Sequence, residues 1–328
     1  MIVKILPKSS PGFAGVTYNT DKIDRSQGEL MRTANFGALD ALDRLRPQDY
    51  INYLQLVSAQ NKRVTQPEFH VVFSAKGDRY TKGELTDTAV KWLEEMGYGA
   101  QPYLIIYHRD TGHNHVHAVT TRVDKSGRKI NSAFEKVRAQ QLLNRVLGYE
   151  WAQTYQVSTK AQFYLLLERN GYTGKDYQEQ KLQALLDQHQ PDRQRALQIR
   201  QWFEAYQHQP DFVLLMRQQF GLDVVFHSAE GKQPYGYTVI DHETRQVFKG
   251  SEILNLQYLL AGRPAAMQTH SAESNGSSIT RVHQLNAEEY AIPAPVYIRP
   301  VSIAADVDDE AIHGRNRRRK KKARTNTR

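Results

Sequence analysis

Alternating apolar and polar positions in the first half of the chain predict three strands. Segment 68–74 is rich in β-branched and aromatic residues, and its period of two places His70 and Ser74 on one face. Segments 103–108 and 115–123 have the same character, and the polar residues between them are typical of a hairpin loop. These two segments should therefore pair as antiparallel neighbours.

Apolar residues that recur at a helical spacing flank the predicted strands. They predict one helix over 86–96, with Thr86 as its N-cap, and another over 132–147. Across 27–60, spaced leucines and other apolar residues predict helices that break at Pro47. Helices mixed with strands, and a hairpin joining two of the strands, indicate an α+β fold with a mainly antiparallel sheet flanked by helices.

The pattern changes after about residue 156, and we interpret 156–262 as a smaller α+β domain that follows a first domain of residues 1–150. It should contain a helix from Ser158 to near Gly171 and a long, largely exposed helix over 178–207. A short helix over 211–220 and a β-rich run over 222–248 complete it.

The end of the chain accounts for its charge. Residues 263–314 have the composition of a linker followed by Pro-punctuated chain, and 315–328 is a basic tail; both are expected to be disordered alone. The tail holds nine of the 44 Lys and Arg residues and none of the 35 Asp and Glu residues, so the net charge of +9 comes from it. Residues 1–150 carry 21 basic and 16 acidic side chains, whereas 151–314 carry 14 and 19. A nucleic-acid partner should therefore bind the first domain and the tail.

Two absences narrow the chemistry and the location. The chain has no cysteine, which excludes disulfides, thiolate zinc sites and a cysteine nucleophile, and which fits a cytoplasmic protein. No apolar run approaches the ~20 residues of a membrane helix, and the first residues lack the pattern of a signal peptide. We therefore expect no membrane insertion.

Most of the legible chemistry lies in 107–117, which holds four of the chain's 12 histidines. His115 and His117 are two apart on a predicted strand, so their side chains leave the same face, roughly 6–7 Å apart along the backbone. His108 ends the preceding strand, and the hairpin brings it back beside them. Three imidazoles can then converge on one metal ion, with Asp110 placed to hydrogen-bond the far nitrogen of a ligand and fix its tautomer.

Three protein ligands leave coordination positions open, which predicts a catalytic rather than a structural metal site. Neutral imidazoles suit Zn, Mn, Co or Ni better than Mg. An ion held in this way can polarise a phosphoryl oxygen and neutralise charge in a transition state.

With these histidines, the sequence resembles the relaxase/mobilisation nuclease family, the HUH-type endonucleases that start conjugative transfer of plasmids and integrative elements. Three motifs carry the resemblance: His115-Val-His117 preceded by His108, the strand ending His70-Val-Val-Phe-Ser74, and Gly15-Val-Thr-Tyr18. The last resembles the motif that holds the family's nucleophilic tyrosine. One departure is His113, which stands where asparagine is expected.

The resemblance covers roughly residues 1–150 and extends more loosely through 235–251. It is greatest to relaxases of small mobilisable elements from Bacteroides-type bacteria, and it implies an HUH endonuclease-like fold. It also implies a bacterial cytoplasmic protein that works with accessory mobilisation and coupling proteins.

The implied reaction is a transesterification in which Tyr18 displaces a 3′-hydroxyl and becomes joined to the 5′-phosphate of the nicked strand. His70 or Asp110 would take the phenol proton. Tyr18 is the only tyrosine among the first 49 residues, and its nearest rivals, Tyr50 and Tyr53, lie in a predicted helix. The family implies Mg or Mn as the divalent ion, whereas the ligand type alone also allows Zn, Co or Ni.

The implied substrate is transfer-origin DNA, single-stranded or locally melted, nicked at one site on one strand. The candidate DNA contacts are charged or polar residues around the histidine motif: Arg109, His113, Arg122, Lys125, Arg128 and Lys129. The basic tail should add non-specific affinity for DNA.

Three other classes of protein remain open at this point. A rolling-circle replication initiator uses the same two-histidine logic, but its tyrosine normally follows the histidine motif. A metal hydrolase or dioxygenase could use three histidines without a tyrosine. A non-catalytic DNA-binding protein would explain the tail but not the histidine cluster.

Overall fold

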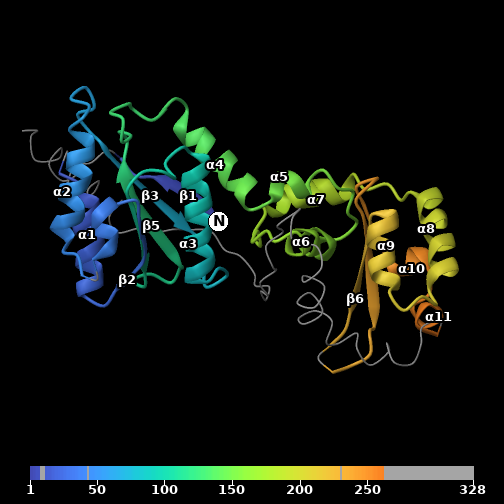
Figure 1. Cartoon of the computed structure of the whole chain (residues 1–328). Helices are drawn as coiled ribbons and strands as arrows, with labels where there is room; N and C mark the ends of the chain where they lie inside the picture. Colours follow the sequence, from blue (N-terminus) through green and yellow to red (C-terminus); the bar gives the residue numbers. More distant parts are fainter. Residues whose placement is uncertain (8–11, 43, 230, 262–328) are drawn as a thin grey trace, which may run out of the picture. The chain divides into compact units, whose positions relative to one another are not determined.

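The computed structural model describes residues 1–7, 12–42, 44–229 and 231–261. The described chain packs as two compact units, one from Met1 to Gly148 and a second that begins at Tyr149 (Figure 1). The predicted linker of 263–314 and the basic tail of 315–328 lie outside the described residues. The DNA affinity predicted for the tail therefore stays a prediction. Among the described residues, no helix is long and apolar enough to span a bilayer.

The first unit is built on a five-stranded antiparallel sheet with the order β1-β3-β5-β4-β2. Its strands are β1 (Ile2–Ile5), β2 (Gly28–Ala34), β3 (Glu68–Ser74), β4 (Tyr103–His108) and β5 (His115–Thr121). The central position belongs to β5, and β3 and β5 are buried along their whole length. The predicted strands and their hairpin are confirmed, as is the α+β class.

Helices cover both faces of this sheet (Figure 1). The helices of this unit are α1 (Ala14–Asp24), the 3-10 helix η1 (Gly37–Ala41), α2 (Pro47–Ser58), α3 (Lys82–Glu95) and α4 (Glu135–Val146). On one face, Val16 of α1 and Leu54 of α2 pack with Leu104 of β4 and Val119 of β5. On the other face, the Trp92 ring of α3 packs against the rings of Phe69 and Phe73 of β3. Alternate residues of each strand therefore face opposite layers of helices, and the residues on the face that meets α1 include the histidines.

The helices predicted over 27–60 are correct in part. Residues 28–34 form β2 and not a helix, because their backbone pairs with β4, a partner that the local leucine spacing does not reveal. The predicted break at Pro47 is present: η1 ends at Ala41, and Pro47 is the first residue of α2, where the missing N–H of proline costs nothing.

The N-cap of α3 also differs from the prediction. Thr81, and not Thr86, caps the helix, in a reciprocal capping box with Glu84. Thr86 lies inside the helix and donates its hydroxyl to the carbonyl of Lys82.

The second unit contains a three-stranded antiparallel sheet, β6-β7-β8, packed with helices (Figure 1). Its elements are α5 (Tyr149–Ala152), α6 (Lys160–Arg169), α7 (Glu179–Asp187), α8 (Arg193–Tyr206), α9 (Phe212–Phe220), β6 (Leu222–His227), β7 (Gly236–Asp241), β8 (Gln246–Lys249), α10 (Gly250–Ile253) and α11 (Leu256–Ala261). Its core joins Phe203 of α8, Phe212 and Met216 of α9, and Val239 of β7. The single helix predicted over 178–207 is in fact α7 and α8.

The break between α7 and α8 has a local cause. Pro191 disfavours helical geometry in the residue before it, and Asp192 then caps α8 by accepting from the backbone N–H of Arg195. The prediction of a largely exposed helix agrees with α8, where eight of the 14 residues are exposed and only Ala196, Ile199 and Phe203 are buried in the core of the unit.

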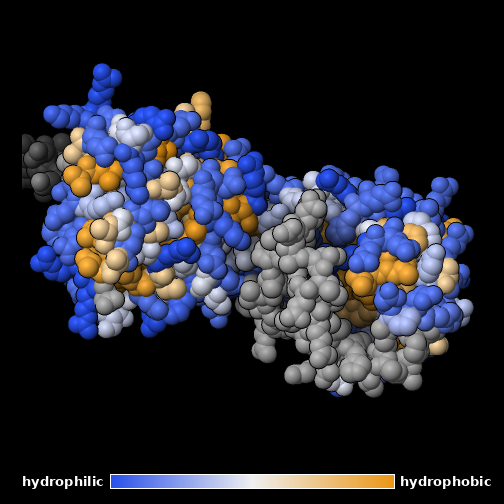
Figure 2. All heavy atoms as spheres, in the orientation of Figure 1, coloured by the Kyte–Doolittle hydropathy of each residue, from blue (hydrophilic) through white to orange (hydrophobic). Residues whose placement is uncertain are grey.

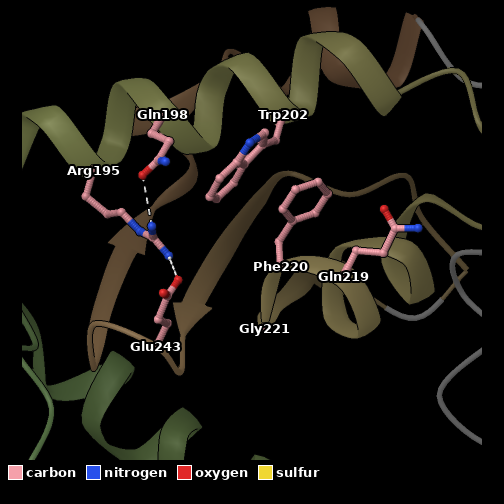
Figure 3. Close-up of a pocket in the computed structure, with 7 residues that line it drawn as sticks. All are labelled: Arg195, Gln198, Trp202, Gln219, Phe220, Gly221 and Glu243. Atoms are coloured by element: carbon pink, nitrogen blue, oxygen red, sulfur yellow. Dashed lines mark hydrogen bonds and ion pairs between the residues drawn. The ribbon is translucent and has the colours of Figure 1, made fainter.

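A hollow of about 470 Å³ opens in the second unit between α8 and the end of α9 (Figure 3). The Trp202 ring is covered by the Phe220 ring at 4.5 Å and by the Arg195 guanidinium at 5.1 Å. Arg195 is itself held by Asp241 and Glu243. Since the aromatic faces and most guanidinium donors are already used, we interpret this cluster as structural.

The surface of the second unit is not uniformly polar. Figure 2 shows an apolar patch over α9, where Val213 and Leu214 are exposed. Single exposed side chains of this size are common on protein surfaces, and two adjacent ones do not identify a binding partner.

Candidate active site

Three histidines meet at one end of the central hairpin. His108 is the last residue of β4 and lies directly across from His115, the first residue of β5. His117 is two residues further along β5 and shares a face with His115. Each offers a ring nitrogen within 4.8 Å of the others, and the rings of His108 and His117 are stacked with centroids 4.1 Å apart. The convergence predicted from the sequence is therefore present.

The cluster is buried, and burial disfavours the charged form of the His108 and His117 imidazoles. The exposed fractions of His108, His115 and His117 are 1%, 3% and 0%. Burial, reinforced by the neighbouring His115, lowers the pKa of His108 to about 3. Burial also holds the pKa of His117 well below 6.5, together with the charges of His70 and the other cluster histidines. Neutral imidazole is the form that binds a metal ion.

Hydrogen bonds behind the cluster orient two of the three rings. Nδ1 of His115 lies 2.9 Å from the carbonyl oxygen of His113, so Nδ1 carries the proton and Nε2 keeps its lone pair. Nδ1 of His117 lies 2.8 Å from Nε2 of His70. If His117 binds a metal through Nε2, this Nδ1–H donates to His70, in the usual arrangement behind a metal-ligating histidine.

His108 gives the clearest sign that the site fits a metal ion. Both of its ring nitrogens are buried, and neither has a hydrogen-bond partner among the residues that the structure describes. A buried polar atom left in this way costs about 1–3 kcal/mol, which an ion bound to His108 would relieve. The three-histidine group could therefore hold a metal, with the ligand set that suits Zn, Mn, Co or Ni.

Tyr18 reaches the cluster from α1, on the same face of the sheet. Its ring centroid lies 5.8 Å from that of His108 and 5.9 Å from that of His117. The sequence placed Tyr18 in a short segment after a turn, and the structure places it in the second turn of a helix. No local pattern predicted that helix, because its hydrophobic face is narrow and its contacts are with distant strands.

Gly15 allows α1 to lie close to β3. Its backbone N–H donates to the Glu68 carboxylate at 3.0 Å. A Cβ at position 15 would lie only 2.8 Å from Nδ1 of His70, closer than real Cβ contacts. The glycine of the Gly15-Val-Thr-Tyr18 motif therefore sets the approach of the helix, and with it the position of Tyr18.

Residues 18–148 match the family model described as relaxase, MobA/VirD2-like, nuclease domain. This relaxase nuclease match starts at Tyr18, includes all three histidines, and ends where the first unit ends. It spans less than half of the chain, and the second unit lies outside it. No curated protein and no solved structure matches this chain significantly. The narrower resemblance to Bacteroides-type relaxases stays a prediction.

The neighbours of His70 differ from those expected if His70 accepted the phenol proton of Tyr18. Burial lowers its pKa to about 3. Its Nε2 contacts Nδ1 of His117 and lies 3.4 Å from Nδ2 of Asn19, which also donates to the Gly15 carbonyl. This arrangement favours an orienting role behind His117. Asn19, fully buried beside Tyr18, was not singled out from the sequence, because a lone asparagine carries no signal there.

Asp110 lies beside the cluster, with one oxygen, Oδ1, 3.7 Å from Nε2 of His115 and the other 2.7 Å from the Lys22 ammonium. The hydrogen bond predicted from Asp110 to the far nitrogen of a ligand is absent for His115, whose Nδ1 uses the His113 carbonyl instead. Burial raises the pKa of Asp110, but the Lys22 hydrogen bond and charge outweigh it, and the net shift is downward. Lys22 was also missed from the sequence, where only its spacing of four from Tyr18 points to it.

The predicted DNA contacts fall into three groups. Arg109 is exposed beside the site and paired with Glu29, whereas His113 accepts the backbone N–H of Gly77. Arg122 is 2% exposed and bonded to Glu135, so its assignment to DNA is corrected to a structural ion pair. The remaining three are exposed but follow the other end of β5, about 20 Å of strand away from His115: Lys125, Arg128 and Lys129.

The pKa values predict a pH-dependent stability for the metal-free relaxase unit. In the folded state the pKa of both His70 and His108 is about 3, whereas the unfolded chain has the ordinary 6.5. Between these values the unfolded state binds more protons, so the free energy of unfolding falls as the pH falls. The loss is about 1.4 kcal/mol per pH unit for each histidine.

Urea unfolding in chelator at pH 7, 6, 5 and 4 measures this loss. His108→Leu should reduce the dependence on pH by the contribution of one histidine, because carboxylate titrations are common to both proteins. An identical pH dependence in the variant would contradict the assignment.

Proposed function

We propose that the protein is a relaxase that nicks transfer-origin DNA at one site on one strand by tyrosine transesterification, to start mobilisation or conjugative transfer. The observation that carries the proposal is the position of the Tyr18 ring, 5.8 Å from His108 and 5.9 Å from His117, within residues that match a relaxase nuclease domain. A three-histidine hydrolase needs no such tyrosine. The second unit lies outside the residues that match the nuclease domain, so it can serve functions other than strand cleavage.

His108, His115 and His117 would hold one divalent ion, which the family implies to be Mg or Mn and which the imidazole donors also allow to be Zn, Co or Ni. When bound, the ion would polarise a phosphoryl oxygen and neutralise developing negative charge. The protein's own contribution is to orient the imidazoles and shield them from water, and burial keeps those of His108 and His117 uncharged. His70 and the His113 carbonyl perform the orientation, by binding the Nδ1 atoms of His117 and His115.

In the proposed step the phenol oxygen of Tyr18 forms a bond to phosphorus and the bond from phosphorus to the 3′-oxygen breaks. The 3′-oxygen takes up one proton from solvent, which balances the one that the phenol loses, and the products are a 3′-hydroxyl and a 5′-phosphotyrosine link. We assign the phenol proton to Asp110, because its Oδ1 is buried without a hydrogen-bond partner in the described structure. Attack of a 3′-hydroxyl on the phosphotyrosine reverses the reaction and rejoins the strand.

The substrate strand must be single-stranded or melted, since a phosphate inside a duplex cannot reach a buried cluster. Arg109 and His113 lie in the loop next to the site and are kept as candidate DNA contacts. The exposed Lys125, Arg128 and Lys129 would contact DNA further along the strand. The proposal also includes that the protein is bacterial and cytoplasmic and that it works with accessory mobilisation and coupling proteins.

The test is covalent capture. A single strand of the parent element's transfer origin, labelled at its 3′ end, is incubated with the protein and Mn²⁺ and separated in denaturing gel. The label should migrate with the protein, because the downstream fragment carries the 5′-phosphate. Label found only in free DNA fragments would indicate hydrolysis, and uncleaved DNA with each candidate metal would reject the proposal.

A further inference from the structure

One cation lies next to the proposed nucleophile and has no role in the chemistry described so far. Lys22 is four residues after Tyr18 on α1, a spacing that puts two side chains on the same helix face. Its ammonium is 5.8 Å from the centroid of the Tyr18 ring. The side chain is only 13% exposed, so the charge is not an ordinary solvated surface charge.

The contacts of Lys22 hold the ammonium at the cluster. Nζ donates to Oδ2 of Asp110 at 2.7 Å, across 88 residues of sequence. An ammonium has three N–H donors, and this bond uses one of them. The charge also reaches the histidines, since it is among the causes that lower the pKa of His108 and His117.

We propose that Lys22 binds the phosphate that Tyr18 attacks. This inference rests on the proposed function, because it takes Tyr18 as the nucleophile. A phosphorus atom within bonding reach of the phenol oxygen lies beside the same helix face, where the free donors of Lys22 can contact a non-bridging oxygen. Asp110 keeps the ammonium in place before DNA binds, so the contact needs no large rearrangement.

The geometry also explains why a lysine serves here. A phosphate at this position is shared between the histidine site and α1, and a compact ammonium contacts one oxygen as a point charge without demanding two. The rival interpretation is that Lys22 and Asp110 form only a structural link between α1 and the hairpin. In that case the pair would affect stability but not the number of phosphate contacts.

The salt dependence of DNA binding separates the two interpretations. All proteins carry Tyr18→Phe so that the probe, a 30-nucleotide single strand of the transfer origin labelled with fluorescein, stays intact in Mn²⁺. Each phosphate contact on a single strand contributes roughly 0.7 to the slope of log affinity against log salt. The key comparison is Lys22→Met/Asp110→Asn with Asp110→Asn alone, because it removes the cation without leaving a buried carboxylate unpaired.

The slope should fall by about 0.7, which corresponds to about fivefold weaker binding at 0.1 M salt. Lys22→Arg should keep the wild-type slope. Lys91→Met, an exposed lysine of α3 on the opposite face of the sheet, removes the same charge and should leave the slope unchanged.

Equal slopes with and without Lys22 would overturn the inference and leave the structural link. Because binding is measured on uncleaved DNA, this outcome is distinct from a failure of the covalent capture that tests the proposed function. Thermal melting of each variant shows whether the folded fractions are comparable.

Discussion

Tyr18→Phe should bind transfer-origin DNA within a factor of about two of the wild-type protein and form at least about a thousandfold less covalent adduct. The substitution removes one oxygen and keeps the ring. The ring should therefore still lie between α1 and the histidines, 5.8 Å from His108 and 5.9 Å from His117. Binding follows from contacts that stay, whereas bond formation requires the atom that is lost.

The matched controls are Tyr50→Phe and Tyr53→Phe. Both residues belong to α2 and pack against Phe36, and among the described residues neither has a ring contact with the three histidines. Each control removes a phenol oxygen from the same unit and should keep the adduct near the wild-type level. An active Tyr18→Phe protein would reject Tyr18 as the nucleophile, and a loss in one of the controls would identify its replacement.

His108→Ala, His115→Ala and His117→Ala should each abolish metal-dependent cleavage, and excess chelator should do the same to the wild-type protein. Removal of one ligand leaves two imidazoles, too few to hold a divalent ion against water. Calorimetric titration with Mn²⁺, Co²⁺ and Zn²⁺ should show the loss of binding directly, without depending on cleavage.

Two further variants should reduce metal affinity by smaller amounts. His70→Ala should weaken metal affinity by about 10–100-fold, the usual cost of losing a partner behind a ligand, because it removes the acceptor for Nδ1 of His117. His113→Ala should be milder in metal binding, since its ring accepts the Gly77 N–H outside the cluster and only its backbone carbonyl supports His115. Cleavage that survives with all added metal removed would contradict a metal-dependent reaction.

Helix caps and breaks separate the local signals that were correct from those that were not. The cap of α6 at Thr159 and the start of α9 after Asp211 agree with the predicted helix starts to within one or two residues. The cap of α3 was misplaced by five residues because both Thr81 and Thr86 are plausible caps by type. Only the reciprocal bond with Glu84 distinguishes them.

The sequence by itself determined the histidine site. His108, His115 and His117 converge because a tight hairpin joins two strands and a period of two keeps alternate side chains on one face, and both properties are local. The tertiary structure alone decided what surrounds them. The contacts of Tyr18, Lys22 and Asn19 depend on α1 packing against β3 through Gly15, over a separation of more than 50 residues.

The same distinction accounts for the corrections. β2 was missed because a strand at the edge of a sheet is defined by its partner, and that partner, β4, lies about 70 residues away. Arg122 was assigned to DNA because an arginine near a basic turn resembles a surface charge. Only its burial against Phe69 and its pairing with Glu135 reveal a structural residue. Burial and pairing are properties of the packed chain, since they depend on which distant side chains arrive at the same place.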